Sequence, residues 1–551
     1  MKARSAALCA ILIWLLWVVN KGAYKGYFSG DELDIFAWMR YTTAGTFLWG
    51  FFTPQFYATN FRPLGHLLFW GLYKTVGLNY PWFLATVQLL HVVNLALLWR
   101  LLPGSWPARA CGLFLFAFHI ACFDDYWKSM TLFDVLCTTF CLAALIAWTR
   151  QRPWWSLLLF WCAYKSKELA IGLPVILLAY EYWLGEKRWR QLTPFFAVSF
   201  LFGLQAVFQQ GGQQSAYGLR LNPTLLVQAI DFYASQILIL PHLGFALLLI
   251  PLFTKDRRIW WGLATFLIFL APMFLVPNRL LSSYLYLPLA GLAYAFAAFA
   301  DRTNWRYAAT LLLVWLPLNY ALLPPLRSTL IAEANETKTY LASVFGLAKR
   351  QPELRTFLID GQPPHLQSWG VTGALRLAFD SNEIETLSVD AHPASQTALA
   401  LLSWDRPAQR LYTLSRIGEQ QDAAWIEMTR LTPVWQLEKG WFGRDASFRW
   451  TAPYASARLW RPAEATSFQI EVNIGVPYLK EIGQVTLETK LNGEVLGRET
   501  FAKPGWRTLT YPLSAGPAAP AQVEFLVSPP FRPSNGDPRR LGIPIGAFGF
   551  R

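Results

Sequence analysis

Three acidic residues follow the first apolar run of the chain. Asp31 and Glu32 come soon after this run, which ends near Asn20, and Asp34 follows them. Because the run is apolar enough to enter a bilayer, the three carboxylates are expected close to the lipid headgroups. A carboxylate there can accept the proton of an incoming hydroxyl, which is the work of a general base. A solvated loop would show the same residues, and spacing alone does not separate the two interpretations.

Basic residues lie beside apolar runs on the side of the membrane where cations are less common. A cation beside a bilayer either extends to the headgroups or binds an anion. Arginine and lysine donors suit phosphate oxygens well. Convergence from three separate loops would favour a bound phosphate over four independent headgroup contacts. The residues are Arg62, Lys165, Lys167 and Arg279.

Polar residues inside the apolar runs are a second group of candidates. His91 and Asn94 lie on one side of a predicted span at i, i+3 spacing, which is more often an interhelical hydrogen bond than a ligand pair. Asp134 lies one turn inside another span, where a charge is costly and therefore indicates a function.

Asp124 and Asp125 are the candidates for a metal site. Two neighbouring carboxylates could coordinate a divalent cation such as Mg or Mn through oxygen, although a pair of loop aspartates is usually solvated. The sequence shows no Cys/His metal spacing, no glycine-rich phosphate loop and no nucleophile elbow. A divalent cation is therefore a possible cofactor rather than a required one.

The composition of the chain predicts the helices and strands that position these residues. Of 551 residues, 54% are hydrophobic and 15% charged, against about 25% charged in ordinary soluble proteins. Between Ala6 and Leu323, apolar runs recur with lengths near the roughly 20 residues of helix that cross a bilayer core. After Ser328 the pattern changes to short alternating stretches with Pro and Gly. The fold class is therefore an α-helical polytopic membrane domain followed by a soluble domain.

Charge placement predicts the topology. The formal charge of +14 would suit nucleic acid, but much of the basic excess lies in short caps between apolar runs, as the positive-inside rule requires of cytoplasmic loops. We therefore expect no nucleic-acid partner, an integral inner (plasma) membrane protein with a cytoplasmic N-terminus, and an extracytoplasmic C-terminal domain. About eleven spans are predicted, near 5–20, 80–100, 109–123, 130–149, 154–165, 169–184, 194–209, 234–253, 259–276, 283–300 and 307–325.

The remaining segments divide the chain further. The first span is interpreted as a retained helix rather than a cleaved signal peptide, because no small-residue cleavage site follows it. Between 21 and 79, aromatic and apolar stretches too short to span predict helices lying in the membrane interface. The domains are 1–330 in the membrane, a small α/β or mixed unit at 340–435, and a β-rich domain at 436–551. Short strands and Gly/Pro turns in the last block indicate a jelly-roll-like sandwich.

An ordered series of short motifs resembles the GT-C superfamily of polyprenyl-phosphate-sugar glycosyltransferases, in its protein O-mannosyltransferase-like branch. Each motif is weak alone, but six occur in the family's order. One departure is Leu132, which stands where the family often has an arginine two residues before the aspartate of the fourth span. The motifs are Asp31-Glu32, Arg62-Pro63-Leu64, Leu90-His91-Val92-Val93-Asn94, Asp134, Ser166-Lys167-Glu168 with Tyr180-Glu181-Tyr182, and Arg279 with Tyr284-Leu285-Tyr286-Leu287-Pro288.

The resemblance implies an inverting transfer from a polyprenyl-phosphate-linked sugar donor to an extracytoplasmic hydroxyl of a glycan or protein acceptor. Asp31 would be the base, with Glu32 or Asp34 orienting it. The leaving phosphate would be held by Arg62, Lys165, Lys167, Arg279 and Tyr284. Supporting roles would fall to His66, His91, Asn94, Asp134 and Glu168.

Two other classes of protein stay open. A transporter or flippase for a lipid-linked glycan would need ionisable residues near mid-span and internal repeats, and no clear repeat is seen. A non-catalytic membrane anchor could display the sandwich as a carbohydrate-binding domain.

Overall fold

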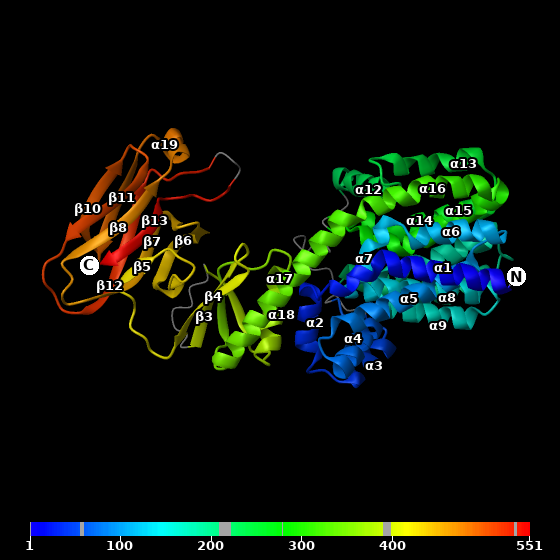
Figure 1. The fold of residues 1–551 in the computed structure, drawn as a ribbon, viewed down its shortest axis with the longest axis horizontal. Helices are drawn as coiled ribbons and strands as arrows, with labels where there is room; N and C mark the ends of the chain where they lie inside the picture. Colours follow the sequence, from blue (N-terminus) through cyan, green and yellow to red (C-terminus); the bar gives the residue numbers. More distant parts are fainter. Residues whose placement is uncertain (1, 56–59, 209–221, 278, 390–397, 534–536) are drawn as a thin grey trace. The chain divides into compact units, whose positions relative to one another are not determined.

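The computed structural model describes residues 2–55, 60–208, 222–277, 279–389, 398–533 and 537–551. The chain divides into two compact units. The first comprises residues 1–32 and 38–335, and the second comprises residues 33–37 and 336–551. The first unit is helical and the second contains the strands (Figure 1). The predicted fold class, apolar helices followed by a β-rich C-terminal domain, is confirmed.

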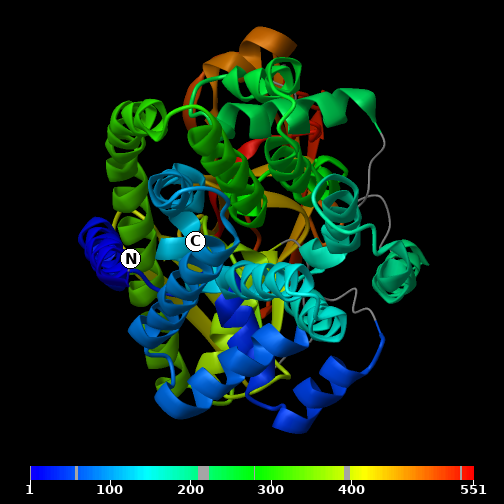
Figure 2. The ribbon, with the colours of Figure 1, turned by 90° about the vertical axis from the view of Figure 1, so that its right-hand side faces the viewer.

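The first unit consists of long helices joined by short helical turns, and two of these helices extend into the second unit at residues 33–37 and 336–350. Its elements are α1 (Lys2–Asn20), η1 (Lys21–Lys25), α2 (Gly30–Met39), α3 (Ala44–Phe52), α4 (Pro63–Val76), α5 (Tyr80–Leu101), α6 (Trp106–Ala117), η2 (Ile120–Cys122), α7 (Phe123–Trp127), η3 (Ser129–Thr131), α8 (Leu132–Thr149), α9 (Pro153–Ser166), η4 (Glu168–Gly172), α10 (Leu173–Trp183), η5 (Trp189–Leu192), α11 (Thr193–Phe208), α12 (Pro223–Ile237), η6 (Leu243–Leu249), α13 (Ile250–Phe253), α14 (Arg257–Phe274), η7 (Ser282–Leu285), α15 (Tyr286–Arg302), α16 (Trp305–Ala321) and α17 (Leu323–Arg350). Figure 2 views these helices from the end that carries the N-terminus.

Fewer helices than the predicted eleven are long and apolar enough to cross a membrane. Within the described ranges there are six, or seven if a pair bent by 52° is one span. The predicted spans near 154–165 and 169–184 fall on α9 and α10, which have 14 and 11 residues where a bilayer core takes about 20. The six are Ala7–Lys25, Tyr80–Leu101, Ser129–Thr149, Trp189–Phe208, Ser282–Arg302 and Trp305–Arg350, and the bent pair is Trp106–Ala117 with Ile120–Trp127.

The predicted span at 234–253 is wrong, because this segment is not one helix. Helix α12 ends at Ile237, and the chain then forms η6 and α13. Pro241 lacks the backbone N–H that a continuous helix would use, and His242 adopts a left-handed conformation at φ 62°. Gly244 packs so closely that a Cβ would lie 2.2 Å from the carbonyl oxygen of Ala234. The apolar sequence therefore folds back beside α12.

Helices α8 and α15 form the centre of the first unit. Their candidate spans are 67% and 89% buried, against 17% for the spans of α11 and α16. Small residues let α14 and α15 approach closely, as in other membrane helix pairs. A Cβ on Gly262 would lie 2.6 Å from the backbone nitrogen of Ala295. The central helices thus carry the residues that the unit buries most deeply.

The second unit contains two sheets. The smaller has the order β2-β1-β3-β4, with β1 parallel to β2 and β3 and with β4 antiparallel to β3. Helix α18 (Gln367–Ala378) connects the parallel strands β1 and β2, as parallel pairing requires a crossover. The strands are β1 (Thr356–Ile359), β2 (Glu385–Ser388), β3 (Ala398–Asp405) and β4 (Arg410–Ile417).

The larger sheet is antiparallel and folds over its own core. Strand β7 pairs with β13 through its first part and with β12 through its second part, so the sheet bends into two facing layers. Phe525 of β12 lies edge-on to Phe548 of β13 at 5.2 Å, inside this core. The described strands are β5 (Trp425–Glu427), β6 (Leu437–Asp445), β7 (Phe448–Arg461), β8 (Ser467–Ile474), β9 (Val485–Leu491), β10 (Glu494–Phe501), β11 (Gly505–Pro512), β12 (Ala519–Ser528) and β13 (Pro544–Phe550), with the short helices η9 (Val434–Gln436) and α19 (Val476–Ile482).

Candidate functional site

The side chain of Glu32 is buried at the start of α2 and holds that helix in place. Its Oε2 atom accepts hydrogen bonds from the backbone N–H and the hydroxyl of Ser29, which forms a capping box. Its Oε1 atom accepts a hydrogen bond of 2.5 Å from the hydroxyl of Ser129 in η3. Burial raises the pKa of Glu32, although the serine hydrogen bonds oppose this effect. Both oxygens therefore have structural partners.

The neighbouring acids on α2 are less buried than Glu32. Asp31 lies in the first turn of the helix, and Asp34 follows one turn later; both are partly exposed. The hydrogen bond between Glu32 and Ser129 fixes the first turn of α2, and Asp31 lies in this turn. The side chain of Asp31 remains partly accessible to solvent.

Two ion pairs bring two predicted loops and the start of one helix together. Arg62, at the start of α4, donates from Nε and Nη2 to the carboxylate of Glu168 at 3.0 and 2.9 Å. The ammonium of Lys167 lies 2.5 and 2.6 Å from the two carboxylate oxygens of Asp134, in the first turn of α8. Lys167 and Glu168 are adjacent in the chain, so one short turn connects the two pairs.

Aromatic rings lie beneath both cations. The guanidinium of Arg62 is 5.4 Å from the centre of the Phe133 ring, and the ammonium of Lys167 is 4.9 Å from that of Tyr284 in η7. Burial alone would lower the pKa of Lys167, but Asp134, Tyr284 and Glu168 together outweigh it and the pKa is raised. Burial alone would raise the pKa of Glu168, but the cations lower it to about 2. Lys167 is therefore protonated and Glu168 is ionised at neutral pH.

The other two predicted cations behave differently. Lys165 donates from Nζ to the backbone carbonyls of Thr53 and Gln55 at 2.6 and 3.3 Å, beyond the end of α3. Arg279 is half-buried in the loop between α14 and η7. The structure thus brings Arg62, Lys167 and Tyr284 together. Arg279 lies in the loop that leads to Tyr284, whereas Lys165 binds backbone carbonyls near the end of α3.

His66 supports the start of α4. Its Nδ1 atom accepts a hydrogen bond of 2.9 Å from the backbone N–H of Arg62, and its ring packs against Phe61 and Phe133. Burial lowers the pKa of His66 to about 3, and the charge of Arg62 adds to this effect. A neutral histidine fixes the backbone of Arg62 and, through it, the first ion pair.

His91 and Asn94 join four helical elements by hydrogen bonds. Nδ1 of His91 lies 2.5 Å from the hydroxyl of Tyr286 on α15, and its Nε2 contacts the hydroxyl of Tyr126 on α7. The Nδ2 atom of Asn94 donates to the same Tyr286 hydroxyl at 3.1 Å and to the carbonyl of Val135 on α8 at 3.0 Å. These contacts are interhelical hydrogen bonds, as the sequence predicted for His91 and Asn94.

The two candidate metal ligands have different environments. Asp124 pairs with Lys128 at 3.0 Å, one turn along the chain. Asp125 is fully buried, and neither of its oxygens has a hydrogen-bond partner in the described part of the chain. It lies close enough to Asp134 and Lys167 to interact with their charges. No group of three or more His, Cys, Asp and Glu among the described residues could hold a metal ion.

Several residues of this site were not singled out from the sequence. The S-x-x-E spacing of Ser29 and Glu32 is a capping-box signature, which would have indicated the structural role of Glu32. Phe133 and Ser129 carry no such signal, because their importance depends on segments distant in the chain. Tyr286 lies in the quoted Tyr-Leu-Tyr motif, but its role between His91 and Asn94 is visible only in the fold.

No family model matches the chain, and no curated protein matches it. A similar solved structure is the crystal structure of ArnT from Cupriavidus metallidurans in the apo state. The two chains are 13% identical, the match covers 76% of this chain and 100% of that one, and the TM-score is 0.43. At this similarity, function has to be argued from the side chains themselves.

Proposed function

We propose that the protein is a membrane glycosyltransferase of the GT-C type, which moves a sugar from a polyprenyl-phosphate donor to an acceptor hydroxyl with inversion. The observation that carries the proposal is the pair of cations Arg62 and Lys167, drawn from separate loops and held together by Glu168 and Asp134. Cations fixed in a partly buried site suit a phosphate group. An active site built where apolar helices end would give access to a lipid-linked donor.

The chemical step assigns different work to the acids and the cations. Asp31 removes the proton of the acceptor hydroxyl as that oxygen forms a bond to the anomeric carbon of the sugar. The bond between this carbon and the phosphate oxygen breaks at the same time, and its electron pair leaves with the lipid phosphate. Negative charge on the phosphate grows as the bond breaks, so fixed cations stabilise the transition state more than the bound donor.

Asp31 is the better candidate for the base because of the contacts of Glu32. The serine hydrogen bonds of Glu32 occupy both of its oxygens, and a general base needs an oxygen within hydrogen-bond reach of its substrate. Glu32 is therefore a positioning residue, which holds the first turn of α2 against η3. Asp31 lies in that turn and is partly exposed.

Local charge balance assigns a role to Arg279. The charges of Arg62, Lys167, Asp134 and Glu168 cancel, and Asp125 lies beside them. A phosphate therefore needs a further cation. Arg279 precedes η7, whose Tyr284 ring lies beneath Lys167. We assign this third cation to Arg279, which would approach the lipid phosphate from the loop after α14.

The proposal is tested by replacing Asp31 with Asn, which keeps the shape of the side chain and removes its basic oxygen. The purified protein is placed in liposomes with a labelled polyprenyl-phosphate sugar, and release of lipid phosphate and transfer of sugar are measured. Transfer is expected to fall by about 10²–10⁴-fold, while donor binding survives. Asp124→Asn is the matched control, because among the described residues the salt bridge of Asp124 is to Lys128 in its own turn, and it should leave transfer unchanged.

Two outcomes would overturn the enzyme assignment. Full transfer by the Asp31→Asn, Glu32→Gln double variant would exclude both Asp31 and Glu32 as the base. Movement of the intact lipid-linked sugar across the liposome membrane, without release of lipid phosphate, would indicate a transporter instead.

A further inference from the structure

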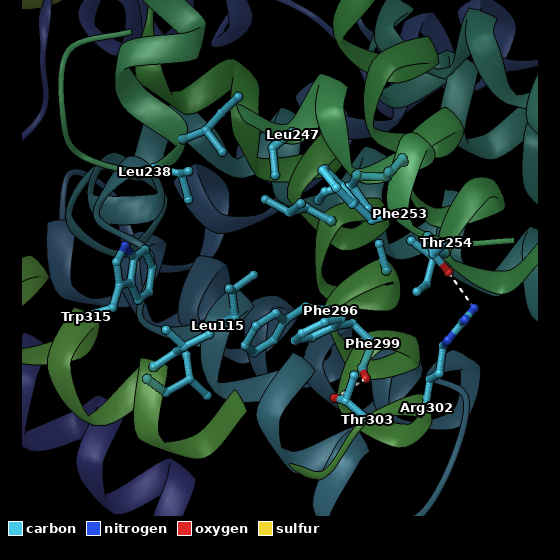
Figure 3. Close-up of a pocket in the computed structure, with 18 residues that line it drawn as sticks. Leu115, Leu238, Leu247, Phe253, Thr254, Phe296, Phe299, Arg302, Thr303 and Trp315 are labelled. Atoms are coloured by element: carbon cyan, nitrogen blue, oxygen red, sulfur yellow. Dashed lines mark hydrogen bonds between the residues drawn. The ribbon is translucent and has the colours of Figure 1, made fainter. Parts of the chain in front are cut away.

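A cavity of about 550 Å³ lies in the first unit, away from the charged residues described above (Figure 3). Its walls come from α6, α14, α15, α16, the last residue of α12 and the segment 238–254 that follows it. None of the residues singled out from the sequence lines it. Its volume falls in the range of about 300–1,000 Å³ that is usual for small-molecule sites.

The lining of the cavity is apolar except at one end. Leu115, Phe296 and Trp315 are among the apolar side chains that line it, and Figure 3 shows Trp315 and Leu238 at the end opposite Arg302. At the polar end, Nη1 of Arg302 donates to the hydroxyl of Thr254 at 2.6 Å. The cavity therefore offers a long apolar surface that leads to one cation.

The dimensions suit one lipid chain. The cavity follows α15 from Leu292 to Arg302, which is about 15 Å of helix at about 1.5 Å per residue. One leaflet of a bilayer core is about 15 Å thick, half of the about 30 Å of the whole. An acyl chain that extends through one leaflet would therefore fill the cavity along its length.

One wall of the cavity carries exposed leucines on its outer side. This wall is formed by η6 and α13, the segment that the sequence predicted as a span and that folds as short turns instead. Leu247 and Ile250 line the cavity, while Leu248, Leu249 and Leu252 of the same segment are exposed. Leucines exposed on an apolar helical unit suit contact with acyl chains, so we infer that the short helices η6 and α13 separate the cavity from the bilayer.

The polar end has an excess of positive charge. Between 255 and 258 and between 301 and 306, five basic residues accompany two acidic ones. Both acids, Asp256 and Asp301, pair with Arg258. In the described ranges, Arg302 has no carboxylate within ion-pair distance, and its side chain is exposed. An anionic group is the complement of this end.

We propose that the cavity binds an anionic phospholipid of the surrounding membrane, with one acyl chain along α15 and its phosphate on Arg302 and Thr254. This lipid would be separate from the polyprenyl-phosphate donor, because the site shares no residue with the charged cluster around Lys167. The inference does not depend on the enzyme assignment.

The test is native mass spectrometry of the intact protein in detergent, titrated with phosphatidylglycerol. Leu247→Trp places a larger side chain in the cavity and is expected to abolish the tightest bound lipid. Leu248→Trp is its control, because Leu248 is the adjacent residue, exposed to lipid and outside the lining. Arg302→Gln should weaken binding about tenfold, the size expected for one charge-assisted hydrogen bond. Arg306 is a cation outside the lining, so Arg306→Gln should not weaken binding.

Each result decides the proposal. One tightly bound phosphatidylglycerol that is lost in Leu247→Trp and kept in Leu248→Trp supports it, as does weaker retention of a diacylglycerol that lacks the phosphate. Equal retention by Leu247→Trp and the unmodified protein overturns it. Retention of polyprenyl phosphate in preference to phosphatidylglycerol would assign the cavity to that lipid and overturn the phospholipid assignment.

Discussion

Lys167 and Asp134 form a buried ion pair in which one ammonium nitrogen contacts both carboxylate oxygens, at 2.5 and 2.6 Å. The pair connects the turn after α9 to the first turn of α8, the helix at the centre of the first unit. A buried charge that loses its partner costs far more than a surface charge does. The stability of this region should therefore depend on both residues together.

We expect Asp134→Ala to destabilise the protein by about 3–5 kcal/mol, because it leaves the Lys167 charge buried without its main partner. Thermal unfolding in detergent measures the change. The double variant Asp134→Ala, Lys167→Met should recover part of the loss, since it removes the stranded charge as well. Additive losses in the two single variants and the double variant would show that the two residues do not act as a pair.

The Arg62–Glu168 pair predicts a defined pH dependence. The cations lower the pKa of Glu168 to about 2 from an ordinary value of 4.5. Its contribution to stability is therefore complete above pH 4.5 and is lost as the pH falls from there toward 2. The difference in melting temperature between wild type and Glu168→Gln should be constant from pH 7 to pH 5 and shrink below. Because the Glu168 side chain is 40% exposed, solvent keeps the difference small.

A difference that grew as the pH fell would contradict the sign of this shift. Glu186→Gln is the matched control. Glu186 accepts a hydrogen bond from Gln151 on an exposed surface, and its replacement leaves the Arg62–Glu168 pair intact, so the pH dependence that this pair causes should be retained.

Arg279→Ala should affect donor binding as well as turnover. A lost phosphate contact weakens the bound donor and, to a larger extent, the transition state, so KM for the lipid donor should rise and kcat should fall. Steady-state kinetics in liposomes separate the two. Arg279→Lys should recover part of both, because a lysine can still contact one phosphate oxygen. An unchanged KM in Arg279→Ala would remove this residue from the phosphate site.

The charge pattern of the loops predicts that residues 340–551 are extracytoplasmic. A reporter that is active only in the cytoplasm, fused after Arg551, should be silent, and a reporter that is active only outside should be active. A second fusion near Arg152, in a basic loop, provides the opposite control. Cytoplasmic activity after Arg551 would reverse the predicted orientation and move Asp31 to the other face of the membrane.

Much of the class of this protein follows from local patterns in the sequence. Apolar runs of membrane-spanning length, and the change to alternating strands after them, depend only on nearby residues. The Asn492-Gly493 turn is another local signal, because both residues adopt positive φ at the hairpin between β9 and β10. The S-x-x-E capping box of α2 is equally readable from Ser29 and Glu32.

The tertiary structure decided which candidate side chains meet. Lys165 and Lys167 are two positions apart and look equivalent in sequence. Lys165 lies in the last turn of α9, but Lys167 caps that helix in an extended conformation, which turns its side chain to Asp134 rather than toward the end of α3. The 234–253 segment has enough apolar residues for a span, yet Pro241 and the close approach at Gly244 fold it back. The sequence identifies each of these residues as a candidate. Their contact partners lie in distant segments of the chain, which come together only when the helices pack.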